Sequence, residues 1–97
     1  MVDITEIVTL SYKPLGDPSL EHMAAGEPYR RFLHHLVRVM RPQAAVELGT
    51  HRGECSALMA AGCRDTLVIG VDSAGLVKDS HAWQFPNFRF LFCDTLG

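Results

Sequence analysis

Three acidic residues, Glu47, Asp72 and Asp94, fall at or near the ends of three apolar segments of the chain. Gly49 and Gly53 follow the first of these segments, and a stretch of small residues with helical character comes next. Glycine lets a backbone turn sharply and approach a ligand closely. A helix that begins near Gly53 directs its free N–H groups and positive dipole end toward a carboxylate or phosphate. The pattern therefore predicts a site for a ligand that carries an anionic group.

The position of Asp72 narrows the class of ligand. It lies about 20 residues past the glycines, at the end of the second apolar segment, where a carboxylate can accept hydrogen bonds from both hydroxyls of a ribose. A turn glycine or a solvated carboxylate can each serve the fold alone, so the prediction depends on their combination. Together these residues indicate a nucleoside-bearing cofactor.

Helices and strands expected along the chain would position these residues. Residues 1–27 remain poorly defined, apart from a helix start at Asp17 and Pro18, where a capping carboxylate precedes proline. The stretch PYRRFLHHLVRVM predicts a helix that Pro42 ends. We expect its apolar stripe to be buried and its arginines and His34 to lie mostly on the other face. The residues of the stripe are Tyr29, Phe32, Leu33, Leu36, Val37 and Met40.

Strands are expected at residues 44–48, 66–72 and 88–94, with a helix over 53–63 and a short helix around 78–84. Strands that alternate with helical connections predict an α/β fold with a parallel sheet, and right-handed crossovers give the strand order 3-2-1. The strands are apolar without alternation, as in strands buried on both faces. Trp83, in the last connection, is expected to pack against the sheet.

Both crossover connections should cover the same face of this half-sheet, which leaves the other face bare and the first strand at an edge. We therefore expect residues 1–97 to form one incomplete domain. A homo-oligomer that completes the sheet is one way to cover these surfaces.

Composition excludes several classes of partner. With a net charge of −2 and 47% hydrophobic residues, the chain gives no reason to expect nucleic acid or an anionic membrane surface as partner. The acidic start is unlike a secretory signal, so the cytoplasm is the expected location. Three cysteines without a C-x-x-C pair predict reduced, buried thiols and neither a disulfide framework nor a metal site.

The spacing of the first motif is E-x-G-x-x-x-G, from Glu47 to Gly53, and not the dinucleotide pattern G-x-G-x-x-G. VELGTHRGECSALMA resembles motif I of the S-adenosylmethionine-dependent methyltransferases with a Rossmann-like fold, nearest the catechol- and caffeoyl-type small-molecule O-methyltransferases. VIGVDS and FRFLFCDTL are similar to the second and third strands of that family. The resemblance covers about residues 30 to 97.

The resemblance implies roles for particular residues. Glu47 would reach the amino group of the methionine portion, beside Gly49 and Gly53, while Asp72 would hold the ribose and Asp94 would lie by the adenine. The full set implied to bind S-adenosylmethionine is Glu47, Gly49, Thr50, His51, Gly53, Asp72, Ser73 and Asp94.

Two residues depart from the family pattern. His51 stands where many members have glycine, and we interpret it as a loop residue and not a general base. Cys55 stands where relatives often place a serine that contacts the cofactor, and Ser56 is one position away.

The resemblance implies the cofactor-binding portion of a small-molecule methyltransferase. In that family the acceptor pocket, the catalytic groups and any Mg²⁺ ligands lie largely after the third strand. Catalytic residues are therefore unassigned here, and catalysis by the isolated monomer is not expected. Two alternatives stay open: a non-catalytic oligomeric module with a relic nucleoside site, and a nicotinamide-dinucleotide domain, which the glycine spacing disfavours.

Overall fold

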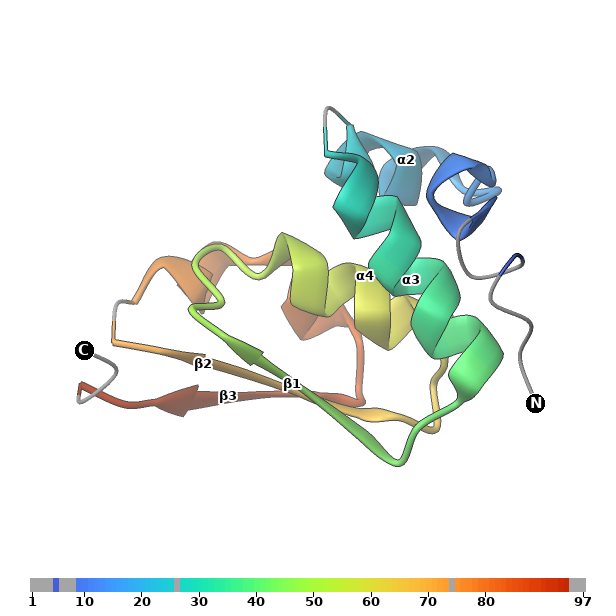
Figure 1. Ribbon diagram of the computed structural model, residues 1–97. Helices are drawn as coiled ribbons and strands as arrows, with labels where there is room; N and C mark the ends of the chain where they lie inside the picture. Colours follow the sequence, from blue (N-terminus) through green and yellow to red (C-terminus); the bar gives the residue numbers. More distant parts are fainter. Residues whose placement is uncertain (1–4, 6–8, 26, 74, 95–97) are drawn as a thin grey trace.

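A computed structural model describes residues 5, 9–25, 27–73 and 75–94 of the chain. Figure 1 shows a sheet with α3, α4 and the connection between β2 and β3 on one side of it. The sheet has three parallel strands in the order β1-β2-β3, which confirms the predicted α/β class and strand order. The elements are η1 (Leu10–Tyr12), α2 (Pro18–Ala24), α3 (Pro28–Met40), β1 (Ala44–Leu48), α4 (Glu54–Gly62), β2 (Leu67–Asp72), η2 (Leu76–Asp79), η3 (His81–Gln84) and β3 (Phe88–Phe92).

The ends of α2 and α3 follow local sequence signals. Asp17 Oδ1 accepts the Ser19 N–H at 2.8 Å, and Pro18 occupies the first turn of α2, as predicted. α3 ends at Met40, and the next residue, Arg41, adopts a left-handed conformation with φ of 49° before Pro42. The start of the poorly defined segment 1–27 lies outside the described residues.

The buried side of α3 differs from the predicted stripe. His34 and His35 are only 5% and 4% exposed, whereas Tyr29 and Met40 are 51% and 53% exposed. The prediction that His34 faces outward was therefore wrong. The cause is the close approach of α3 to α4, where a Cβ on Gly62 would lie 2.5 Å from the His34 carbonyl oxygen.

Burial favours the neutral form of both histidine rings, and each ring also finds a carbonyl acceptor for its N–H group. His34 Nδ1 donates to Leu58 O at 2.8 Å, and His35 Nε2 donates to Lys13 O at 3.0 Å. His35 Nδ1 in turn accepts from Arg38 Nε at 3.3 Å, so it cannot also carry a proton. Burial is the main cause that lowers the pKa of both rings, and the charge of Arg38 adds to it.

We expect the free energy of unfolding to fall as the pH drops from 7.5 to 5. The folded-state pKa of both histidines lies below their ordinary value of 6.5, so the unfolded chain binds more protons below that pH. The contribution of the two neutral histidines to the free energy of unfolding is complete above about pH 6.5. It is lost as the pH falls toward their lowered folded-state pKa. Urea unfolding at several pH values measures this dependence.

Two variants test whether His34 and His35 cause this pH dependence of stability. His34→Asn with His35→Gln keeps an N–H donor at each site without a titrating ring, so its stability should change less with pH. His22→Gln alters an exposed histidine and should keep the full pH dependence. Equal slopes for all three proteins between pH 5 and 7.5 would contradict the interpretation.

The two faces of the sheet are unequal. Val68 and Phe88 are buried beneath the helices, at 0% and 2% exposure. On the opposite face Val46, Leu48 and Leu91 are 58%, 70% and 56% exposed. This confirms that one face stays uncovered by the described residues and that β1 is an edge strand, while the expectation of strands buried on both faces was wrong within this chain.

The connection from β2 to β3 is tighter than predicted. Two 3₁₀ turns, η2 and η3, replace the short helix expected around 78–84. Trp83 Nε1 donates to Val77 O at 2.7 Å, and the indole packs edge-on against Phe88, so its predicted packing role is confirmed. β3 ends at Phe92 and not at Asp94, because its partner β2 ends at Asp72, which pairs with Phe92.

Candidate functional site

The turn from β1 to α4 is held against the end of β2. The N–H groups of Gly49 and Thr50 both donate to Val71 O, at 2.8 and 3.1 Å. Gly49 and Gly53 have φ of 74° and 78°, in the left-handed region that favours glycine. The two motif glycines are therefore needed by the backbone of the turn.

His51 adopts the same unusual backbone conformation, with φ of 50°. Its N–H donates to Asp72 Oδ2 at 2.7 Å, which ties the loop to the end of β2. The His51 side chain is exposed.

Glu47, in β1, accepts hydrogen bonds from side chains of the turn and of α4. The hydroxyls of Thr50 and Ser56 both donate to its Oε1, at 2.6 and 2.7 Å, and the two hydroxyl oxygens lie 2.9 Å apart. Thr50 and Ser56 are 4% and 0% exposed, so these bonds are sheltered from water. A carboxylate offers about four lone-pair sites, so Glu47 retains acceptor capacity for a ligand.

Gly70, which lies outside the predicted site, makes room for this arrangement. It pairs with Glu47 across the sheet, and a Cβ at this position would lie 2.4 Å from Thr50 Oγ1. A glycine inside a strand marks close approach of another group, which was the available signal. Ser56 is one position away from the serine of the family pattern, and only the structure shows that it contacts Glu47.

A cleft of about 270 Å³ opens beside this network. It lies between the start of α3, the turn and the start of α4. The predicted site residues that line it are Glu47, Gly49, Thr50, His51 and Gly53, and further lining residues include Tyr29, Arg30, Glu54 and Cys55. The structure thus gathers most of the predicted set around one cavity.

The other predicted residues lie away from the cleft lining. Asp72 is 8% exposed, and its two oxygens accept the N–H groups of His51 and Ser73, each at 2.7 Å. Its observed role is to anchor the turn. Ser73 and Asp94 are exposed, and Asp94 lies in the turn after β3.

Cys55 faces the cleft as a protonated thiol. Burial is the first cause that raises its pKa, and the Glu47 carboxylate raises it further. A thiol held in this form is a poor nucleophile at neutral pH. All three cysteines are free; Cys55 and Cys63 are buried as predicted, whereas Cys93 is partly exposed.

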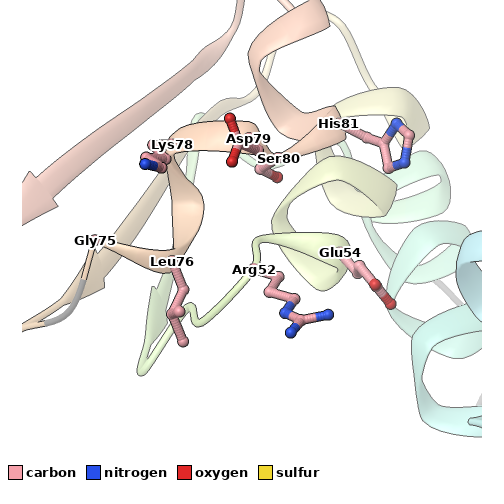
Figure 2. Close-up of a pocket in the computed structure, with 8 residues that line it drawn as sticks. All are labelled: Arg52, Glu54, Gly75, Leu76, Lys78, Asp79, Ser80 and His81. Atoms are coloured by element: carbon pink, nitrogen blue, oxygen red, sulfur yellow. The ribbon is translucent and has the colours of Figure 1, made fainter.

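A larger cavity of about 440 Å³ adjoins the cleft and shares Arg52, Glu54 and Leu76 with it. It contains none of the predicted residues. Figure 2 shows Arg52 and Glu54 extending to one side, whereas Lys78 and Asp79 point elsewhere. Because its charged groups diverge, we place the candidate site in the smaller cleft.

Within the described ranges, no cluster of three or more histidine, cysteine or acidic side chains is arranged to hold a metal ion. Over the same residues, no helix has the length and apolar character needed to cross a membrane. Comparisons with known proteins gave no matching family model, curated protein or solved structure.

Proposed function

We propose that the chain binds S-adenosylmethionine in this cleft, as the cofactor-binding part of a small-molecule O-methyltransferase. The observation that carries the proposal is the Glu47 carboxylate, fixed by the Thr50 and Ser56 hydroxyls at the wall of the cleft. An oriented carboxylate in a partly desolvated site binds an ammonium group well. We expect the Glu47 carboxylate to bind the amino group of S-adenosylmethionine.

Other residues would contact the remainder of the cofactor. Asp72, whose oxygens accept the N–H groups of His51 and Ser73, would accept the ribose hydroxyls at the end of β2. Its burial means that the ribose must approach closely. Asp94, Ser73 and the exposed surface near them would border the adenine.

The bound cofactor would supply an activated methyl group on sulfur. In the proposed reaction an acceptor hydroxyl oxygen would take this methyl group as the methyl–sulfur bond breaks, S-adenosylhomocysteine would leave, and the hydroxyl proton would pass to solvent. The protein would contribute positioning and exclusion of water from the reacting atoms. The described residues supply the cofactor side of the site. The molecule that accepts the methyl group is a small molecule in this proposal.

Calorimetric titration with S-adenosylhomocysteine tests the proposal. We expect measurable binding, and we expect Asp72→Ala to weaken it about tenfold or more, because hydrogen bonds to a charged group contribute ~1.5–3 kcal/mol. Asp65→Ala, at an exposed residue paired with Arg41, is the control and should bind normally. No heat at millimolar ligand, from a sample shown to be folded, would refute the proposal.

A second candidate function is a homo-oligomeric module that does not catalyse. The exposed side chains of Val46, Leu48, Leu67 and Leu91 on the open sheet face favour it, since a second copy would remove them from water. Light scattering on the same sample separates the two candidates. An obligate dimer that gives no heat with S-adenosylhomocysteine supports the second, whereas a monomer argues against it.

A further inference from the structure

The cleft carries charges of both signs. Glu47 lines it from β1, and Arg30 lines it from the first turn of α3. Cys55 lines the same cleft, so all three side chains border one cavity. A carboxylate and a guanidinium around one small cavity match the two charges of an α-amino acid.

Arg30 is already positioned but incompletely used. Its Nη1 donates to Met23 O at 3.0 Å and forms an ion pair with Glu54 in the first turn of α4. Its Nε is buried and has no hydrogen-bond partner among the described residues. A guanidinium has five N–H donors, so Arg30 retains capacity for a further acceptor.

The ion pair between Arg30 and Glu54 is replaceable. The side chains of Arg30 and Glu54 are 23% and 37% exposed, and ion pairs open to solvent contribute only ~0–1 kcal/mol. A ligand carboxylate held in the cleft would compete with Glu54 without the cost of ordering a long side chain. Arginine also binds a carboxylate with two parallel hydrogen bonds, which lysine does not.

We propose that Arg30 binds the carboxylate of a ligand's amino-acid end, in exchange for Glu54, while Glu47 binds the amino group of the same ligand. This inference rests on the proposed function and extends it, because it makes the zwitterionic amino-acid end the feature that the cleft selects. It also assigns opposite effects to two residues that form one ion pair. Arg30 favours the ligand, and Glu54 competes with it.

Calorimetry with two ligands tests this exchange. One ligand is S-adenosylhomocysteine, and the other is its analogue without the α-carboxylate, which retains the amino group. Arg30→Met should weaken binding of the first about tenfold or more and leave binding of the second unchanged. The affinity of Arg30→Lys for S-adenosylhomocysteine should lie between that of Arg30→Met and that of the unaltered protein.

Glu54→Gln provides the readout that a purely structural ion pair would not give. It frees Arg30, so affinity for S-adenosylhomocysteine should rise severalfold, with no change for the decarboxylated analogue. Equal affinities in Arg30→Met and the unaltered protein, or equal losses for both ligands, would overturn the exchange and leave the proposed function standing. Absence of binding by the unaltered, folded protein would overturn both.

Discussion

Replacing Gly70 with alanine should weaken binding of S-adenosylhomocysteine more than tenfold and lower the free energy of unfolding by about 2 kcal/mol. The new Cβ would lie 2.4 Å from Thr50 Oγ1 and 3.0 Å from Thr50 Cβ, so Thr50 has to move. Glu47 then loses one of its two hydroxyl donors at the wall of the cleft. Calorimetric titration and urea unfolding of the variant measure the two effects.

A double-mutant cycle with Thr50→Ala shows whether the loss of binding passes through Thr50. Both single variants remove the same hydrogen bond to Glu47, so the double variant should bind ligand about as weakly as either one. Fully additive losses would mean that Gly70 acts by another route. Unchanged binding in Gly70→Ala would show that Thr50 does not orient Glu47 for the ligand.

The turn was predictable because its signals are local. Gly49 and Gly53 adopt backbone conformations that favour glycine, and both appear in one short motif with Glu47. The strands were likewise visible as apolar segments, and their order followed from the handedness of the crossovers. Local chemistry and a chirality rule therefore sufficed for the sheet and for the turn that forms one wall of the cleft.

The supports of the site depend on residues far apart in the sequence. Gly70 meets Thr50 only because β2 pairs with β1. Arg30 reaches the cleft only because α3 packs against α4, and the position of an arginine on a helix does not predict this contact. These interactions are set by tertiary packing, which periodicity along a single helix or strand does not encode.

The burial of His34 and His35 also depends on tertiary packing that helical periodicity does not encode. Their helix has an apolar stripe that predicts another buried face, yet its exposed members include Tyr29 and Met40. Close backbone contact with α4 and carbonyl acceptors for both rings decided the orientation instead. Hydrogen bonding thus offset the cost of burying two polar rings.

Gly62→Ala should destabilise the fold, although the same change inside an isolated helix stabilises it by about 1 kcal/mol. Gly62 is the last residue of α4, and its added Cβ would lie 2.5 Å from the His34 carbonyl oxygen. That oxygen belongs to the backbone of α3, so a side-chain rotation cannot relieve the contact. The helices must separate, and overpacking of this kind costs ~1–3 kcal/mol or more.

The net loss from Gly62→Ala should be about 1–2 kcal/mol in urea unfolding, because the steric cost exceeds the gain in helix propensity. Gly75→Ala is the matched control, since a Cβ there meets nothing within 4 Å and its φ of −89° suits any residue. The control should leave stability unchanged or raise it slightly. If Gly62→Ala were as stable as the control, α3 would not pack on α4 as closely as described. The start of α3 carries Arg30, so separation of the helices should also weaken binding of S-adenosylhomocysteine.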